Sequence, residues 1–254
     1  MEIKTPIVSI LIPTRNRVNK LKKCLDNLFK TCYDKYNFEV LCGVDNDDCE
    51  TIDFLDEYII NHPNVKYFLF EKGGYKNIYK ISNYLALQSS GHFLFLYADD
   101  SEIISYNWDL VIKEHNNKII TLNPLVNSLK HYVRNLDPNI PKYVWFIYPI
   151  IPKKLVDIIG RTSNNTATDS WISELVYQAQ IPNIQEDNII IEHYRFDETQ
   201  NEDHIDSLYY EVANDRKFVS TDFYSEYQVQ ERIKDIEKIK SYIKSFEKEN
   251  TLHS

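Results

Sequence analysis

The sequence predicts an α/β protein with a mostly parallel central sheet flanked by helices. In the first hundred residues, short apolar runs alternate with segments of helical periodicity. The helical segments are about 10 to 15 residues long, the length of the crossover that joins two parallel strands. The apolar runs are nearly continuous rather than alternating, which is typical of strands buried on both faces. These observations favour consecutive βαβ units.

The first half contains four predicted strands and three predicted helices. Apolar runs bounded by turn residues or charges predict strands at 6–13, 38–44, 65–70 and 92–97. Apolar residues that recur every three or four positions predict helices at 18–29, 49–62 and 75–89. Because βαβ crossovers are right-handed, the strands should lie parallel and end at one edge of the sheet.

The second half is less regular. Strands are expected at 118–123, 143–150 and 188–193, and helices at 153–159, 169–180 and 227–250. We treat residues 1–220 as one domain and residues 221–254 as a C-terminal amphipathic helix. The apolar stripe of this helix should pack on the domain or on a second copy, which would make a homodimer. That stripe comprises Val229, Ile233, Ile236, Ile243 and Phe246.

Composition excludes several classes of protein. The chain has 254 residues, of which 43% are hydrophobic, so it can bury a core without a disulfide or structural metal. A formal charge of −9 disfavours binding to nucleic acid. Neither a Walker nor a dinucleotide-binding glycine motif occurs, and the four cysteines lack zinc-ligand spacing. No apolar run is long enough to span a membrane. We expect a cytoplasmic protein, with contact to a membrane surface through the C-terminal helix as an alternative.

Three polar clusters follow predicted strands, at residues 14–17, 45–48 and 99–100. Parallel sheets bind ligands at this edge. The adjacent carboxylates of Asp99 and Asp100 repel each other, so they either bind a divalent cation or form a solvated turn. Asp45 either accepts a hydrogen bond from a nucleobase or caps the next helix. Arg15 and Arg17 either neutralise a diphosphate or are ordinary exposed arginines.

Together these segments resemble the family 2 glycosyltransferases. "VSILIPTRNRVNKLKKCLDNL" is similar to the opening strand, loop and helix of that family, and "FEVLCGVDNDD" to its second strand and aspartate-rich turn. "SNYLALQSSGHFLFLYADD" matches a third family segment in length and register. Asn83, Gly91 and the Asp99–Asp100 pair fall on family positions, whereas Tyr97 replaces the first aspartate of the DxD motif.

The resemblance implies a GT-A fold and inverting transfer of a sugar from a nucleoside diphosphate donor, UDP by default, to a hydroxyl acceptor such as a glycan. It implies that Mn²⁺ or Mg²⁺ is held by Asp99 and Asp100. Ser82 stands where the family has an arginine, so Lys76 or Lys80 is expected to contact phosphate instead. The implied nucleotide-sugar-binding residues are Pro13, Thr14, Arg15, Arg17, Asp45, Lys76, Asn83 and Asp99.

Two further residues are candidates for the chemistry. His193 follows a short apolar strand and is a candidate third ligand of the metal or diphosphate, or else a structural histidine. Asp169 opens a predicted helix after a polar loop, which fits either a catalytic base or an N-cap. If Asp169 is not the base, Glu174 or the Asp197–Glu198 pair comes next.

Two other functions remain open. One is a nucleotidyltransferase of similar sheet architecture, and the other is a degenerate relative that binds sugar without catalysis. Nucleotidyltransferases of that kind usually have a glycine-rich basic loop after the first strand, where this chain has "PTRNR". A degenerate binder would be expected to lose Asp45 or the Asp99–Asp100 pair, yet all three are present.

Overall fold

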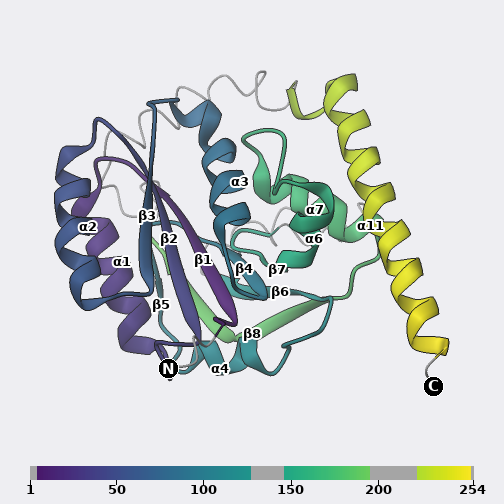
Figure 1. The fold of residues 1–254 in the computed structure, drawn as a ribbon, viewed down its shortest axis with the longest axis horizontal. Coiled ribbons are helices and arrows are strands. Elements are labelled where there is room, and N and C mark those ends of the chain that lie inside the picture. The colour runs from purple at the N-terminus through teal and green to yellow at the C-terminus, as the bar shows by residue number, and fades with distance from the viewer. Residues whose placement is uncertain (1–4, 127–145, 195–221, 253–254) are drawn as a thin grey trace.

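The computed structural model describes residues 5–126, 146–194 and 222–252. These residues form one eight-stranded sheet with the strand order β3-β2-β1-β4-β7-β6-β8-β5, covered by helices (Figure 1). The strands are β1 Val8–Thr14, β2 Phe38–Asp45, β3 Val65–Phe70, β4 Phe93–Leu96, β5 Ser101–Ile103, β6 Thr121–Val126, β7 Ile150–Pro152 and β8 Asn183–His193. The helices are α1 Val18–Thr31, α2 Cys49–Asn61, the 3-10 turn η1 Tyr75–Asn77, α3 Ile78–Gln88, α4 Trp108–Lys113, α6 Lys153–Ile159, α7 Thr168–Gln178 and α11 Glu226–Leu252.

The first half of the sheet is parallel, as predicted. β1 pairs with both β2 and β4, and β2 pairs with β3, all in parallel. The connections run through α1, α2 and α3, so each strand ends at the same edge. This arrangement brings the turns after β1, β2 and β4 together, because these three strands are neighbours in the sheet.

The second half of the sheet is mixed rather than parallel. β7 runs antiparallel to both β4 and β6, while β8 runs parallel to β6 and antiparallel to β5. The strand predicted at 143–150 is wrong over its described part, because β7 begins only at Ile150 and residues 146–149 form no strand. The apolar residues of this segment reflect burial rather than strand pairing, because Phe146 and Tyr148 are buried in a segment that forms no strand. The sequence prediction also missed β5 and α4, which are too short for a periodic pattern.

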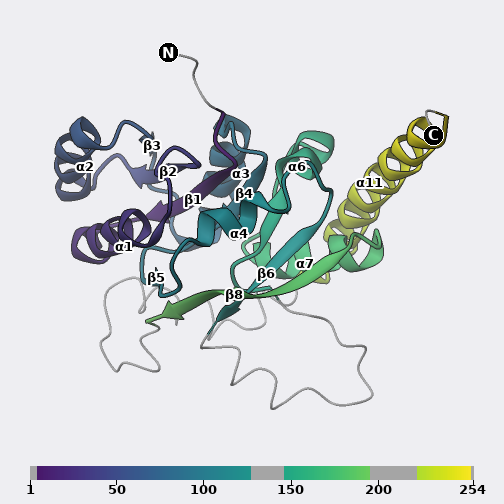
Figure 2. The same cartoon turned by 90° about the horizontal axis from the view of Figure 1, so that it is seen from below.

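Strand side chains alternate between two hydrophobic cores, one on each face of the sheet. On β1, Ile10 and Ile12 face the core that also contains residues of α1, α2 and α4. Leu11, between them, faces the core formed with α3, α6, α7 and α11. Figure 2 shows the first group of helices and α6 on different sides of the parallel strands. The cores therefore fix the sheet from both faces and leave its carboxyl edge to carry the polar turns.

The C-terminal helix buries a face that differs from the predicted one. Ile236 and Ile243 pack against the second core as expected, but Ile233 is exposed. The buried positions of α11 are mostly polar, and they recur at helical spacing: Gln228, Arg232, Asp235 and Ile239. This face contacts α6 and α7, so a second copy cannot use it for a dimer without displacing these contacts. The domain boundary expected near residue 220 lies outside the described residues.

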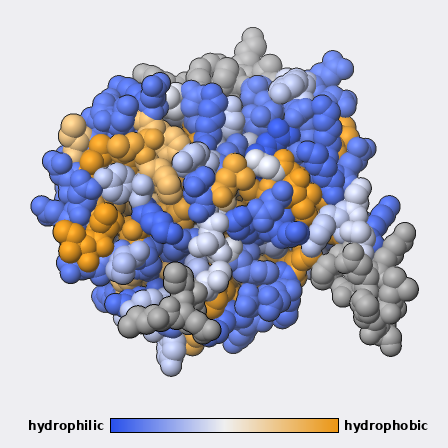
Figure 3. Space-filling view, viewed as in Figure 1, coloured by the Kyte–Doolittle hydropathy of each residue, from blue (hydrophilic) through white to orange (hydrophobic). Residues whose placement is uncertain are grey.

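The surface carries scattered apolar side chains. On the face shown in Figure 3, apolar residues form separate patches among polar ones. Leu69 of β3 and Leu87 of α3 are among the exposed large apolar side chains. In the described ranges, no helix combines the length and the apolar character that crossing a membrane requires.

A buried carboxylate connects the first three strands of the chain to β4. Glu39 of β2 accepts hydrogen bonds from the Ser9 hydroxyl at 2.7 Å and from the Ser90 amide at 2.6 Å, and it pairs with Lys66 at 2.9 Å. Beside it, the Gly91 amide donates to the Ser9 hydroxyl at 2.8 Å. A Cβ on Gly91 would lie 2.6 Å from the Ser9 backbone nitrogen, so only glycine fits there.

We predict that Glu39→Gln destabilises the protein by about 1–3 kcal/mol at neutral pH, because it replaces a charged acceptor in a buried network. Burial alone would raise the pKa of Glu39, but its hydrogen bonds and Lys66 lower it overall. A lowered folded-state pKa stabilises above the unfolded value near about 4.3, and the stabilisation disappears as pH falls through the folded value. Urea unfolding should therefore show the difference from wild type shrinking below about pH 4.

Glu57→Gln, on the exposed side of α2, is the matched control and should change little at any pH. An equal loss of stability at pH 3 and pH 7 in Glu39→Gln would contradict this account of the carboxylate.

Candidate active site

A large cavity lies at the carboxyl edge of the parallel strands. Its volume is about 1210 Å³, above the roughly 300–1,000 Å³ of common ligand pockets. The turns after β1, β2 and β4 form one part of its wall. The loop after β3, the first part of α3, residues 146–149, the start of α7 and the end of β8 also line it. The cavity therefore has room for a nucleotide sugar together with part of an acceptor. Of the predicted site residues, Pro13, Thr14, Arg15, Arg17, Asp45, Asp99, Asp100, Asp169 and His193 line it.

Arg17 joins the end of β1 to the acidic pair after β4. Its guanidinium contacts Asp99 Oδ1 at 2.9 Å and Asp100 Oδ2 at 2.8 Å. Thr14 donates to the other Asp99 oxygen at 2.6 Å. All four side chains are largely buried, and a buried pair of like charges requires such compensation. The alternative of an exposed acidic turn with free arginines is therefore wrong.

The two acidic residues differ in their protonation behaviour. Burial raises the pKa of the Asp99 carboxyl, and the Arg17 charge opposes this only in part. Burial would also raise the pKa of Asp100, but His193 and Arg17 outweigh it and hold that pKa below its usual range. Asp100 is thus the more firmly ionised of the pair.

Arg15 pairs with the carboxylates at the end of β2, as Arg17 does with those after β4. Its guanidinium contacts Asp45 at 2.8 Å and Asp47 Oδ2 at 2.9 Å. Burial raises the pKa of Asp45, again against the Arg15 charge. The expected alternative of Asp45 as a helix cap is wrong, because Asp48 caps α2 by accepting from the Thr51 amide at 3.2 Å. Asp45 instead lies at the cavity wall, where it pairs with Arg15.

A left-handed residue directs the two arginines to different strands. Asn16 has φ of 49°, and its amide donates to Asp48 Oδ2 at 2.5 Å. Asparagine tolerates this conformation better than most residues. The turn leaves Arg15 beside the end of β2 and Arg17 beside the end of β4.

Asp100 and His193 are the best-placed pair for a divalent cation. His193 Nε2 lies 3.3 Å from Asp100 Oδ1, and the Tyr148 ring packs edge-on against the imidazole at 5.2 Å. Carboxylate oxygen and imidazole nitrogen suit Mn²⁺, and such metals often take further ligands from substrate phosphates. Within the described ranges, no three His, Cys, Asp or Glu side chains group closely enough to hold an ion alone. The residues fit a cation that a diphosphate helps to bind.

Asp169 lies in the first turn of α7 and is not its N-cap. The cap position belongs to Ala167, and the Asp169 carboxylate accepts from the Ser170 amide at 2.7 Å. The carboxylate is exposed to the cavity, yet the surrounding protein raises its pKa, opposed by hydrogen bonds from Ser170. A raised pKa makes this carboxylate a stronger proton acceptor than an ordinary aspartate.

Two other predicted nucleotide-sugar contacts, Asn83 and Lys76, are not among the described residues that line the cavity. Asn83 lies outside the cavity lining, and both ends of its amide bond to residues 162 and 163. Its prediction as a nucleotide-sugar contact is therefore not supported. Lys76 lies in η1, but its side chain is outside the described part of the structure. Lys80, the alternative phosphate contact, lines the cavity.

Sequence reasoning missed part of the cavity wall. Residues 71–75, after β3, line it and include Gly74 with φ of 68°. A glycine pair directly after a predicted strand was the available signal. Tyr148 also lines the cavity, and its hydroxyl lies 2.6 Å from that of Ser101. Nothing in the sequence distinguished this tyrosine from an ordinary strand residue.

Known proteins share both the sequence pattern and the fold. Residues 9–104 match the sequence model of the glycosyl transferase family 2. The chain is 25% identical over 146 residues to the dolichyl N-acetyl-alpha-D-glucosaminyl phosphate 3-beta-D-2,3-diacetamido-2,3-dideoxy-beta-D-glucuronosyltransferase of Methanococcus voltae. That alignment covers 54% of this chain and 44% of the relative. The chain thus spans less than half of that protein.

Two solved structures have a similar fold. The mannosyltransferase PcManGT of Pyrobaculum calidifontis, in complex with GDP-Man and Mn²⁺, superposes with a TM-score of 0.59 at 15% identity, over 75% of this chain and 57% of that one. S. aureus TarS residues 1–349, in complex with UDP-GlcNAc, superposes with a TM-score of 0.57 at 19% identity, over 79% of this chain and 60% of that one. The chain therefore has the GT-A fold of these two proteins, and its residues 9–104 are similar to glycosyl transferase family 2.

Proposed function

We propose that this protein is a metal-dependent inverting glycosyltransferase that moves a sugar from a nucleoside diphosphate sugar, UDP by default, to a hydroxyl of an acceptor such as a glycan. The main support for this proposal is that one cavity contains the three groups of side chains that the reaction needs. It holds Asp100 beside His193, the Asp45–Arg15 pair, and the Asp169 side chain. The fold similarity to proteins solved with GDP-Man or UDP-GlcNAc supports the choice of donor class.

The donor half of the cavity suits a nucleotide. Asp45 is positioned to accept a hydrogen bond from a nucleobase ring N–H, since Arg15 fixes its orientation. Lys72 and Lys80 line the cavity and supply positive charge for phosphate oxygens. Asp100 Oδ1 and His193 Nε2 would hold Mn²⁺ or Mg²⁺. Such an ion supplies electrostatic stabilisation of the diphosphate leaving group when bound.

Asp169 is the proposed base. In the transfer, an acceptor hydroxyl oxygen forms a bond to the anomeric carbon as the bond from that carbon to the diphosphate breaks. The hydroxyl proton passes to the Asp169 carboxylate, and the electron pair of the broken bond leaves with the nucleotide. Attack opposite the leaving group inverts the anomeric configuration. Two earlier alternatives are less favourable: Glu174 pairs with Arg232 at 2.7 Å, and Asp197 and Glu198 lie outside the described residues.

Thermal melting with nucleotides tests the proposal. UDP or GDP should raise the melting temperature more with Mn²⁺ than without it, and hydrolysis of a panel of nucleotide sugars should then identify the donor. Stabilisation by nucleoside triphosphates alone would favour a nucleotidyltransferase. No shift with any nucleotide would favour a non-catalytic relative.

We predict that Asp100→Asn removes the Mn²⁺-dependent part of the nucleotide-induced shift, as does His193→Ala to a lesser degree. Asp99→Asn should instead lower the melting temperature of the unliganded protein, because Asp99 is occupied by Arg17 and Thr14. Asp26→Asn, on α1 and outside the cavity lining, is the matched control. A full Mn²⁺ effect in Asp100→Asn would exclude Asp100 as a ligand.

We predict that Asp169→Asn lowers kcat by about 10²–10⁴ while leaving donor affinity unchanged, because it removes the proton acceptor. In the wild type, kcat should fall as pH drops through the raised pKa of Asp169, and the variant should lack this acid limb. Asp157→Asn, exposed on α6, serves as the control. Retention of more than about a tenth of wild-type turnover would rule out the role of base.

A further inference from the structure

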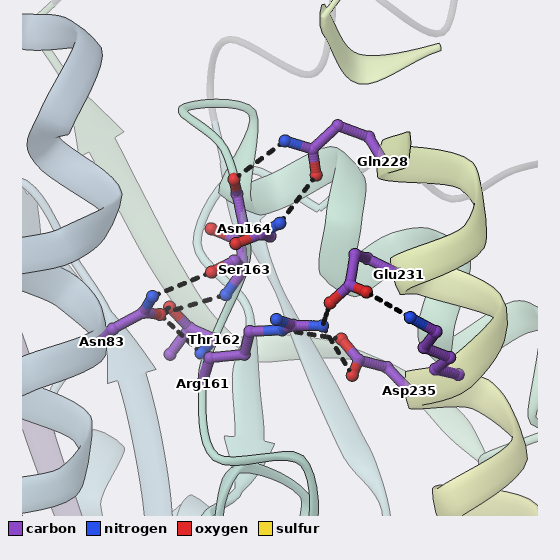
Figure 4. A network of polar contacts seen from close by, with 9 residues as sticks. Asn83, Arg161, Thr162, Ser163, Asn164, Gln228, Glu231 and Asp235 are labelled. Carbon is purple, nitrogen blue, oxygen red and sulfur yellow. Dashed lines mark hydrogen bonds and ion pairs between the residues drawn. The ribbon is translucent and has the colours of Figure 1, made fainter. Parts of the chain in front are cut away.

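The loop that leads to Asp169 is held between two helices. This α6–α7 loop, residues 160–167, lies between α3 on one side and α11 on the other, as Figure 4 shows. Its two outer contacts come from Asn83 of α3 and from polar side chains of α11. On its inner side, Thr166 and the following α7 residues line the cavity.

Asn83 supplies hydrogen-bond partners to the buried backbone at the start of the loop. Its Oδ1 accepts from the Thr162 amide at 2.7 Å, from the Thr162 hydroxyl at 2.6 Å and from the Ser163 amide at 3.1 Å. Its Nδ2 donates to the Ser163 carbonyl at 2.8 Å. Thr162 and Ser163 are almost fully buried, so without Asn83 these backbone groups would lack hydrogen-bond partners.

Helix α11 holds the other side of the loop through charges and amides. Arg161 pairs with Asp235 at 3.0 Å and with Glu231 at 2.9 Å. Gln228 donates to the Asn164 carbonyl at 3.2 Å and accepts from the Asn164 side chain at 3.1 Å. Asp235 is fully buried, and a buried ion pair of this kind adds little net stability over apolar packing. The polar face of α11 therefore fits a role in fixing the position of the α6–α7 loop.

A second contact fixes α7 itself. Arg232 of α11 lies with its guanidinium carbon 5.2 Å from the Trp171 ring centre and 3.9 Å from that of Phe223. The same side chain pairs with Glu174 of α7 at 2.7 Å. Arg232 and Trp171 are buried, so this stack limits rotation and sliding of α7 against α11.

Hydrogen bonds within the loop connect the residues that Asn83 contacts to the start of α7 at the cavity wall. The Ser163 hydroxyl donates to the Asn165 carbonyl at 2.8 Å and lies 2.9 Å from the Thr168 hydroxyl. The Asn165 side chain accepts from the Ala167 amide at 3.1 Å. Thr168 is the first residue of α7 and directly precedes Asp169. The contacts from Asn83 thus reach the residue next to the proposed base.

We propose that Asn83 and the polar face of α11 are positioning residues for sugar transfer, because they fix the α6–α7 loop and with it the carboxylate of Asp169. This inference rests on the proposed function of Asp169. A base displaced by a fraction of an ångström to 1 Å loses much of its efficiency even when donor binding is intact. The C-terminal helix then contributes to the geometry of the reaction, although none of its described side chains lines the cavity.

The test compares Asn83→Leu, Asn83→Asp and Gln228→Ala in the full chain, with Glu237→Gln on the exposed side of α11 as the matched control. Three quantities are measured: the Kd of UDP with Mn²⁺, kcat for hydrolysis of the best donor in the panel, and amide hydrogen exchange of residues 162–169. Asn83→Leu should leave Kd within about twofold, speed exchange about tenfold and lower kcat by about 10- to 100-fold.

Asn83→Asp should restore part of kcat, because its carboxylate can accept the same three hydrogen bonds but cannot donate to the Ser163 carbonyl. Gln228→Ala removes two bonds to Asn164 without touching Asn83, so it tests the loop independently if Asn83→Leu fails to fold. Faster exchange with unchanged kcat would overturn the inference alone. Failure of the wild-type protein to bind any nucleotide would instead overturn the proposed function.

Discussion

The ion pairs of Arg17 with Asp99 and Asp100 are the interaction on which the candidate site depends. They join the ends of β1 and β4, which are neighbours in the sheet, and they allow two adjacent carboxylates to be buried. Without a cation between them, two such charges would be costly to bury. Arg17 also determines which oxygen remains for a ligand, since it and Thr14 occupy both oxygens of Asp99. Asp100 Oδ1 is then directed toward His193.

This arrangement should make binding of the metal ion depend on binding of the nucleotide. A divalent cation would meet one carboxylate oxygen and one imidazole nitrogen, with a guanidinium close by. Those donors are too few for tight binding of a bare ion, whereas phosphate oxygens would complete the coordination. The positive charge of Arg17 opposes the ion alone and favours the anionic complex of the ion with a diphosphate. Binding of metal and nucleotide should therefore be coupled.

The parallel half of the fold could be predicted from the sequence, because local patterns specify its strands and helices. β1 and β2 are buried apolar runs, and β3 is a partly buried apolar run at the edge of the sheet. Helices of clear periodicity separate these strands, and local pattern specifies such units. The polar turns at their ends could be placed at one edge because parallel strands leave no other arrangement. The second half depends on long-range pairing, such as β7 between β4 and β6, which no local pattern encodes. The polar face of α11 escaped prediction for the same reason: Asp235 and Arg232 have partners far away in the sequence.

The most direct test of the central claim is a Mn²⁺ titration followed by electron paramagnetic resonance of the free ion, with and without UDP. With protein alone, the signal of free Mn²⁺ should fall little, because Arg17 occupies the acidic pair. With UDP present, the signal should fall to one bound ion per chain, and replacing Asp100 with Asn should abolish that decrease. Tight stoichiometric binding of Mn²⁺ in the absence of nucleotide would contradict the account, as would UDP binding that is indifferent to the metal.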